Sequence, residues 1–338
     1  MTNPGREPGR HLVLVGPTAS GKSATALVLA MERSAAGMAT EIISCDSMAV
    51  YRGMDIGTAT PTAEEQELVA HHLIDVADPA EEFSVRRFVD LVDGALDGIE
   101  ERGASAILVG GTGLYVQAVV DRLDLPGRYP EVLADLEPLG TGELARRLGQ
   151  LDPVAATRVP PGNRRRLLRA LEVTIGSGRP FSASGPGLAA HPPTPFPMLG
   201  LAVGREVLTQ RIRIRYERQM AAGLLDEVRA LSERPEGWSR TAREALGYRE
   251  LAAHLRGELD LAEAVEEAVR RTRRFAVRQE RWFRRDPRIQ WVDAPDAGSQ
   301  SVSTAGIAEA AHAVAQRWSE LADGGRGDAT TVDPSCCD

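Results

Sequence analysis

The chain has 338 residues, of which 43% are hydrophobic and 26% are charged, and its formal net charge is −8 at pH 7. This composition predicts a globular protein with an ample core, built as two domains or as one large α/β domain with an insertion. The acidic balance argues against a protein that is basic over its whole surface, although local basic clusters can still bind nucleic acid.

Length and patterning also exclude several classes of protein. No apolar run reaches about 18 residues and residues 1–10 are polar, so we expect no membrane span, no signal peptide and a cytoplasmic location. The cysteines, Cys45, Cys336 and Cys337, lack metal-ligand spacing, which predicts neither a disulfide nor a zinc site. We expect residues 1–10 and 323–338 to be disordered tails.

A glycine-rich turn follows the first predicted strand, residues 12–15, and precedes a predicted helix over 24–31. Its sequence is Gly16-Pro17-Thr18-Ala19-Ser20-Gly21-Lys22-Ser23, which fits the phosphate-binding loop G-x-x-x-x-G-K-[ST]. Inward-facing amide groups and the positive end of the helix favour a bound di- or triphosphate. Lys22 is the only lysine of the chain, and its compact ammonium fits such a cradle better than a guanidinium does. Ser23 is the usual ligand of Mg²⁺ in this motif.

Further strands of a parallel sheet are predicted at 41–45, 72–75, 106–109 and 198–203, with helices at 84–102, 114–120 and 205–222. Asp46 follows the second strand and therefore reaches the carboxyl edge of the sheet, where open α/β sheets bind ligands. It is the preferred candidate base, although orienting magnesium or capping a helix are equal alternatives. Asp55 and Asp75 are weaker candidates, and residues 48–62 read as a binding loop.

Two threonines at this edge each have two possible roles. The hydroxyl of Thr18 either bonds an oxygen between two groups of the ligand or only shapes the loop. Thr112 follows the strand at 106–109 within Gly110-Gly111-Thr112-Gly113, and it either contacts a ligand or caps the next helix. His71 and His72 have no triad-like partners, so we treat them as structural.

The pattern changes between Asp121 and Pro197, where short helices at 143–150, 153–158 and 163–175 precede a Gly/Pro/Ser-rich stretch. More helices run to about 285, followed by an extended segment at 286–293 and a helix at 303–322. We therefore expect an α/β fold with a P-loop NTPase-like parallel sheet, flanking helices and a mainly helical insertion domain. Residues 11–121 and 197–322 would form the catalytic core, and residues 122–196 the insertion.

Arginine is concentrated in two clusters. Residues 270–288 hold nine arginines and two acids, with Phe275, Trp282 and Phe283 interleaved, which is typical of a surface that binds a polyphosphate backbone and stacked bases. The second cluster is Arg164, Arg165, Arg166 and Arg169. Either could instead be a solvated helix face. Arg211 and Arg215 share one face of the helix after 198–203 and either reach a diphosphate or form exposed ion pairs.

Together these stretches resemble one family, the tRNA dimethylallyltransferases, also called tRNA isopentenyltransferases. The matching stretches occur in family order and are Gly16 to Ser23, Asp46-Ser47, Tyr51 to Ala59, Val109 to Tyr115, Arg169 to Val173, Gly247-Tyr248-Arg249, Arg278-Gln279 and Trp282-Phe283-Arg284. A generic P-loop enzyme would share only the first of them.

The resemblance implies transfer of a dimethylallyl group from dimethylallyl diphosphate to the N6 amine of the adenosine 3′ of the anticodon, in tRNAs that read codons beginning with U. It implies that the P-loop with Lys22, Mg²⁺ on Ser23 and Arg215 holds the leaving diphosphate. Thr18 would bond the bridging oxygen and Asp46 would accept the amine proton. We expect a monomer that binds the tRNA anticodon stem-loop and contacts no membrane.

Residues expected from this resemblance to contact tRNA come from several segments. They are Asp46, Ser47, Met48, Ala49, Thr112, Arg165, Arg166, Arg169, Gly247, Tyr248, Arg249, Arg278, Gln279, Arg281, Trp282 and Arg284.

The chain departs from the family pattern at four places: Ala49 where glutamine is common, Thr60 for lysine, Asn163 within Gly162-Asn163 for an Asn-Asp pair, and Gln219 for methionine. Three other functions compete with the resemblance: a prenyltransferase acting on free adenine nucleotides, a small-molecule P-loop kinase, and an RNA-binding module with a relic P-loop. The two arginine clusters and the insertion disfavour the first. The lack of an arginine-rich lid separate from the stretches above disfavours the kinase, and Lys22 together with Asp46 disfavours the third.

Overall fold

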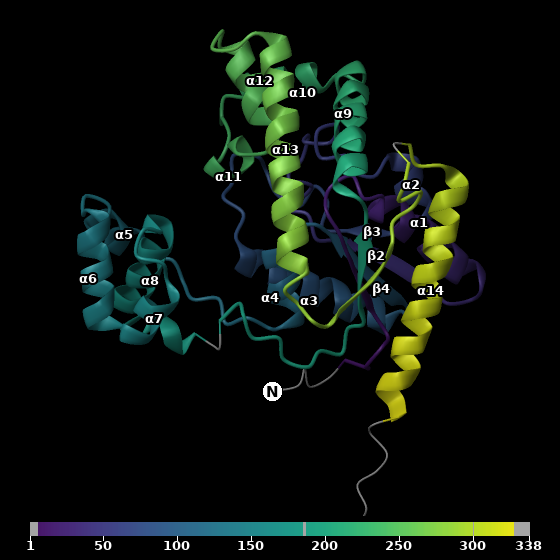
Figure 1. The fold of residues 1–338 in the computed structure, drawn as a ribbon, viewed down its shortest axis with the longest axis horizontal. Coiled ribbons are helices and arrows are strands. Elements are labelled where there is room, and N and C mark those ends of the chain that lie inside the picture. Colours follow the sequence, from purple (N-terminus) through teal and green to yellow (C-terminus); the bar gives the residue numbers. More distant parts are fainter. Residues whose placement is uncertain (1–5, 185–186, 300, 328–338) are drawn as a thin grey trace, which may run out of the picture. The chain divides into compact units, whose positions relative to one another are not determined.

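The structure, a computed structural model, describes residues 6–184, 187–299 and 301–327. The strands are β1 Leu12–Val15, β2 Thr40–Ser44, β3 His71–His72, β4 Ser105–Gly110, β5 Met198–Ala202 and β6 Ile289–Asp293. All of them pair in parallel in one sheet with the order β3-β2-β4-β1-β5-β6. Strands β2, β3 and β4 of this sheet are labelled in Figure 1. This arrangement confirms the predicted α/β fold class.

The helices surround this sheet or belong to the inserted segment. They are α1 Lys22–Ala35, α2 Ala63–Leu68, α3 Val85–Glu101, α4 Gly113–Val120, α5 Pro130–Leu136, α6 Thr141–Leu151, α7 Pro153–Arg158, α8 Arg164–Ser177, η1 Phe181–Ala183, α9 Arg205–Ala221, α10 Leu224–Ser232, α11 Arg240–Arg243, α12 Tyr248–Leu255, α13 Leu261–Phe283 and α14 Thr304–Gly327.

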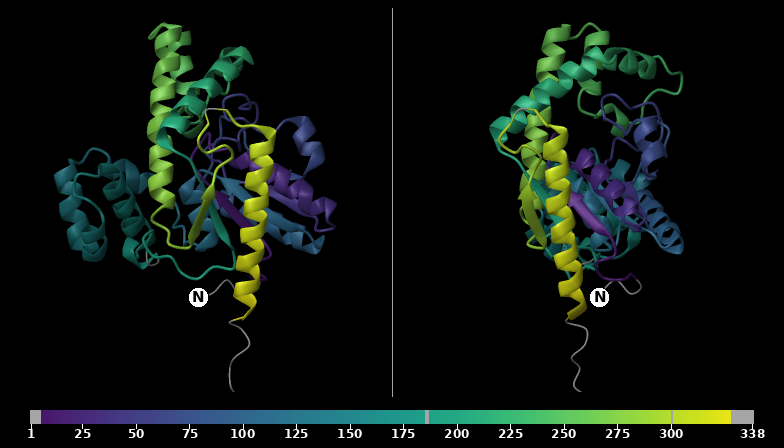
Figure 2. Two further views of the ribbon diagram at one scale, coloured as in Figure 1. Left: turned by 45° about the vertical axis from the view of Figure 1, so that its right-hand side comes forward. Right: turned by 90° about the vertical axis from the view of Figure 1, so that its right-hand side faces the viewer.

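Each face of the sheet has its own apolar core, because successive side chains of a strand point to opposite faces. Leu12 and Leu14 of β1 belong to a cluster completed by α1 and α14, which lie beside each other in both views of Figure 2. Val13 and Val15 belong to a larger cluster that includes buried residues of α3, α4, α9, α10, α12 and α13. The nearly continuous apolar strands in the sequence reflect this burial on both faces.

The chain divides into two compact units, one of residues 121–191 and one containing the sheet. The inserted unit has its own core of leucines from α5, α6 and α8, among them Leu136, Leu148 and Leu171. Residues 192–196, expected in the insertion, group with the sheet instead. Their backbone is tied there, because Pro195 O accepts from Gly9 N at 2.9 Å and Pro192 O accepts from the Arg288 guanidinium at 2.6 Å.

Some predicted elements differ in extent. The strand expected at 72–75 ends at His72, because Leu73 and Asp75 adopt φ of 61° and 55°, outside the β region. Helix α2 follows the predicted binding loop and was not predicted from the sequence; Thr62 and Glu65 form a capping box that begins it. The inserted unit contains α5, which the sequence pattern did not predict, and it begins with Pro130 in its first turn.

Part of each segment expected to be a disordered tail has a described structure. Residues 323–327 continue α14, and Arg6 is bound to carboxylates of α3, at 2.9 Å from both Asp97 and Glu100. The rest of the predicted tails, residues 1–5 and 328–338 with Cys336 and Cys337, lies outside the described residues. Within the described ranges, no helix combines the length and the apolar character needed to cross a membrane.

His11 links the start of β1 to α3 and β4. Its Nδ1 accepts the amide of Ala106 at 2.9 Å, so Nε2 carries the proton and donates to Glu100 at 2.8 Å. Burial lowers the pKa of His11. The unfolded state therefore binds a proton at His11 more readily than the folded state does. The stabilisation that neutral His11 gives the fold is complete above about pH 6.5 and is lost as the pH falls.

We expect His11→Leu to lower the free energy of unfolding by about 1–3 kcal/mol at pH 7.5, because the Ala106 amide loses its acceptor. The variant should also lose part of the decline in stability that wild type shows between pH 7.5 and 5.5. Urea unfolding at the two pH values measures both effects. Parallel pH profiles for wild type and variant would contradict this role of the imidazole.

Candidate active site

The P-loop lies between β1 and α1, and two of its residues adopt left-handed backbone conformations. Gly21 has φ of 90° and Ala19 has φ of 63°. Gly16 is also required, because a Cβ there would lie 2.9 Å from Oγ of the fully buried Ser20. Four consecutive or nearly consecutive amides, those of Ala19, Gly21, Lys22 and Ser23, find no acceptor in the described part of the chain. At the N-terminus of a 14-residue helix they form an anion site.

Lys22 supplies the cation of this anion site. Its Nζ lies 3.4 Å from Pro17 O, and burial lowers the pKa of the ammonium to about 8, with the Asp46 charge opposing that shift and the Arg215 charge adding to it. The three side chains are therefore close enough to interact electrostatically. The hydroxyl of Ser23, in the first turn of α1, is exposed.

Asp46 lies in a tight turn at the carboxyl end of β2. One carboxylate oxygen accepts the amide of Met48 at 2.8 Å, and the other makes no hydrogen bond with the described residues. Thr112 fixes the same turn, because its hydroxyl accepts the amide of Ser47 at 3.1 Å and donates to Ser47 Oγ. This contact, rather than a helix cap, is what the Thr112 side chain makes. Strand β4 lies between β2 and β1. Gly110, at the end of β4, allows the backbone there to approach the end of β2, since a Cβ at Gly110 would lie 2.3 Å from Cys45 O.

Arg215 reaches the P-loop from α9. It donates through Nη1 to Thr18 Oγ1 at 3.2 Å and through Nη2 to the carbonyl groups of Gly57 and Thr58 at 3.3 and 3.1 Å. Arg211 does not join it, contrary to one reading of their shared helix face. Its guanidinium is buried and donates to the backbone carbonyl groups of residues 295, 296 and 299.

Gln279 of α13 joins the P-loop to the turn after β4. Its Oε1 accepts the amide of Thr18 at 2.8 Å, and its Nε2 donates to Gly111 O at 2.9 Å. One turn later, Trp282 packs on Gly113, where a Cβ would lie 2.3 Å from the indole ring. The buried Gln279 side chain is thus an internal brace of the P-loop, with both of its polar atoms bonded to backbone groups.

A family model described as IPP transferase matches residues 49–286. The chain belongs to this family. The match begins just after Asp46, so the P-loop lies outside the matched residues.

Relatives of the IPP transferase family resemble the chain over most of its length. A tRNA dimethylallyltransferase of Kineococcus radiotolerans is 48% identical over 291 residues, which cover 84% of this chain and 91% of the relative. The crystal structure of a full-length tRNA isopentenylpyrophosphate transferase from Bacillus halodurans is 37% identical with a TM-score of 0.66, covering 94% of this chain and 99% of the other. A eukaryotic dimethylallyltransferase crystallised acting on tRNA is 26% identical with a TM-score of 0.74, covering 92% and 79%. The predicted family and enzyme class are confirmed.

The arginines expected to contact tRNA fall into two groups. In the inserted unit, Arg165 and Arg166 are exposed and have no carboxylate partner within the described ranges, whereas Arg169 bonds Pro126 O and pairs with the buried Glu172. On α13, Arg278 and Arg281 likewise lack a carboxylate partner among the residues that the structure describes. In contrast, Arg284, just after α13, lies 3.5 Å from Glu280 and stacks over Trp291.

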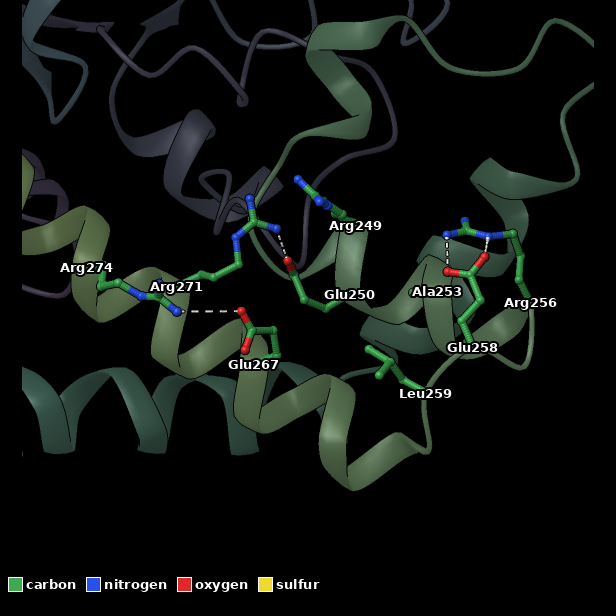
Figure 3. Close-up of a pocket in the computed structure, with 9 residues that line it drawn as sticks. All are labelled: Arg249, Glu250, Ala253, Arg256, Glu258, Leu259, Glu267, Arg271 and Arg274. Carbon is green, nitrogen blue, oxygen red and sulfur yellow. Dashed lines mark hydrogen bonds and ion pairs between the residues drawn. The ribbon is translucent and has the colours of Figure 1, made fainter. Parts of the chain in front are cut away.

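Arg249 lines a pocket of about 460 Å³ between α12 and α13 (Figure 3). The pocket also contains Arg256, Arg271 and Arg274, together with three glutamates. Each arginine is already in an ion pair: Arg249 with Glu244, Arg256 with Glu258, Arg271 with Glu250 and Arg274 with Glu267. The pocket is therefore nearly neutral, and much of the positive charge predicted for 270–288 is compensated.

Other residues of the predicted tRNA set lie inside the protein. Ala49 is buried, and Tyr248 is 1% exposed with its hydroxyl donating to Glu227 at 2.6 Å. Gly247 starts α12 with φ of 88° and gives its amide to Glu250. Sequence reasoning missed Glu227 and the bracing role of Gln279. The available signal was a glutamine on the apolar stripe of α13, at the spacing of the buried residues Thr272, Ala276 and Phe283.

Proposed function

We propose that this chain transfers a dimethylallyl group from dimethylallyl diphosphate to the N6 amine of the adenosine 3′ of the anticodon, in tRNAs that read codons beginning with U. The observation that carries the proposal is the cluster of unpaired P-loop amides with Lys22 and Arg215, with the Asp46 carboxylate at the end of β2 close enough to Lys22 to interact electrostatically. A diphosphate leaving group needs these donors, and an attacking amine needs the carboxylate. The relatives named above support the same reaction.

In this reaction the exocyclic amine attacks the allylic carbon while the bond from that carbon to the diphosphate oxygen breaks. Negative charge grows on the diphosphate, so donors fixed before the reaction stabilise the transition state more than the ground state. Lys22, the loop amides and Arg215 supply that stabilisation, and Thr18 bonds the bridging oxygen. The amine proton goes to Asp46, whose second oxygen has no partner within the described residues.

Mg²⁺ is part of this proposal. The described residues contain no group of three His, Cys, Asp or Glu side chains able to hold a metal. A single hydroxyl donor in the P-loop fits a magnesium ion held mainly by substrate phosphates and water, since Mg²⁺ binds few protein groups in such sites. The exposed Ser23 hydroxyl would be its protein ligand. The ion, when bound, neutralises charge on the diphosphate.

The target adenosine has to leave the anticodon-loop stack to approach Asp46, as in other enzymes that act on a base. We propose that Ser47, Met48 and Thr112 line this approach, and that Arg165, Arg166, Arg278 and Arg281 bind the RNA backbone. The test is the transfer of radiolabelled dimethylallyl, with magnesium, to an anticodon stem-loop and in parallel to AMP. Label on the stem-loop alone is expected. Label on AMP would instead indicate a free-nucleotide prenyltransferase.

The pKa of Lys22 makes diphosphate binding depend on pH. A bound diphosphate stabilises the ammonium, so binding above about pH 8 has to be accompanied by proton uptake, and affinity should fall by up to about tenfold per pH unit there. Calorimetry with inorganic diphosphate in two buffers of different ionisation enthalpy measures that uptake. Because Lys22 is the only lysine, ¹⁵N-labelled lysine gives one side-chain NMR signal whose titration reads the pKa directly. An unshifted value near 10.4 would contradict this prediction.

A further inference from the structure

Residues 55–58 form a loop that is hydrogen-bonded to α9 through its carbonyl groups. Gln219 Nε2 donates to Ile56 O at 2.6 Å and to Gly57 O at 3.0 Å. Arg215 donates to the carbonyl groups of Gly57 and Thr58 with the same guanidinium that contacts Thr18. The position of this loop therefore fixes the direction in which Arg215 presents its remaining N–H groups.

The amide side of the same loop is held by a single carboxylate, Glu227 of α10. Its Oε2 accepts the amides of Asp55 and Ile56 at 3.0 and 2.8 Å, and its Oε1 accepts the amide of Gly57 at 3.3 Å. The Tyr248 hydroxyl also donates to Oε1. Four donors to one ionised group form a charge-assisted cluster with a defined orientation.

Tyr248 also limits how the loop can move. A Cβ at Gly57 would lie 2.3 Å from the Tyr248 ring, so the backbone is in direct contact with the ring. The ring is 1% exposed and belongs to the main apolar core. The loop is thus held by its packing on Tyr248, by Glu227 of α10 and by Gln219 of α9.

We propose that Glu227 is a positioning residue for the transfer reaction. It holds residues 55–58 in the conformation that orients the Arg215 guanidinium toward Thr18 and the leaving diphosphate, without touching either substrate. The proposal rests on the proposed function of this site. It assigns a role to a residue on α10 that no P-loop or arginine motif of the sequence indicates.

The first variant is Glu227→Gln, which keeps the shape of the side chain. One carboxylate oxygen becomes an NH₂ donor that faces amide donors of the loop, so the cluster cannot be satisfied. We expect kcat for dimethylallyl transfer to fall about 10- to 100-fold, because small displacements of a positioned catalytic group have effects of that size. The KM for the stem-loop should stay unchanged. The matched control is Asp226→Asn on the same turn, whose side chain is 78% exposed and which should retain wild-type kinetics.

Because Glu227 acts through Arg215 in this proposal, the effects of Glu227→Gln and Arg215→Ala on kcat should not be additive. In an Arg215→Ala background, Glu227→Gln should lower kcat by less than about threefold, since the group that it orients is absent. Equal losses in both backgrounds would overturn the proposal in favour of a general structural role, and unchanged kcat in the wild-type background would overturn it outright. Should Glu227→Gln fail to fold, Tyr248→Phe is the second variant. It removes only one of the donors to Glu227, so we expect a smaller fall in kcat.

A second measurement does not depend on the reaction. Glu227→Gln should accelerate hydrogen exchange of the amides of residues 55–57, whereas Asp226→Asn should not. Unchanged exchange would contradict the proposal even if activity fell. Failure of wild type to transfer dimethylallyl would instead refute the proposed function, and the exchange data would still decide whether Glu227 holds the loop.

Discussion

Asp46→Asn is expected to lower the single-turnover rate of dimethylallyl transfer by roughly 10²- to 10⁴-fold, the range for loss of a general base. The amide oxygen of asparagine can still accept the amide of Met48, so the turn that holds position 46 is kept and only the proton acceptor is removed. Binding of inorganic diphosphate should change little. Rapid-quench kinetics with labelled dimethylallyl diphosphate and a stem-loop measure the rate.

Asp75→Asn is the matched control for that variant. Asp75 is an exposed carboxylate after β3, at the same edge of the sheet, and it is one of the weaker candidates from the sequence. Its φ of 55° is a conformation that asparagine tolerates well, so the substitution should leave both fold and rate unchanged. A large loss for Asp75→Asn with little loss for Asp46→Asn would reassign the base.

Lys22→Met should lower kcat/KM by roughly 10²- to 10³-fold, as expected when a fixed positive group that faces developing charge is removed. Methionine has a similar length, and it removes a cation whose pKa is already lowered by burial. The melting temperature should therefore stay level or rise while activity falls. This opposite behaviour separates a role in the reaction from a role in folding.

Lys22→Arg should be no more active than Lys22→Met. A planar guanidinium does not fit where the compact ammonium approaches Pro17 O at 3.4 Å. Steady-state kinetics and thermal unfolding of both variants provide the test. Activity of Lys22→Met within threefold of wild type would mean that the P-loop amides and Arg215 suffice, and that Lys22 has no essential part. Activity of Lys22→Arg within threefold of wild type would mean that any cation serves at this position.

Much of the fold was predictable because its signals are local. The apolar strands, the P-loop between β1 and α1 and the N-cap Ser84 of α3 each follow from short stretches of sequence. The position of β4 between β1 and β2 was not predictable, because strand order depends on contacts distant in sequence. Only the structure shows that Gly110 is the residue that lets β4 pass close to Cys45.

The site was predictable only in part, for a similar reason. Lys22 and Asp46 are found from motif and strand position. Two partners of Arg215 are backbone carbonyl groups of residues 57 and 58, and no sequence pattern indicates that these groups bind an arginine of α9. Charge counting also overestimated the basic surface of 270–288, since Arg271 and Arg274 pair with glutamates of other segments or other turns. Partners brought together by tertiary structure decide which arginines remain available to RNA.

The most direct test of the proposed reaction is product analysis after a single turnover on an anticodon stem-loop with labelled dimethylallyl diphosphate and magnesium. Digestion to nucleosides should release one labelled product, N6-dimethylallyladenosine, from the position 3′ of the anticodon. A stem-loop with purine riboside there, which lacks the exocyclic amine, should give none. Label at another position, label on the purine riboside substrate, or phosphate transfer from ATP in a parallel reaction without dimethylallyl transfer would contradict the account.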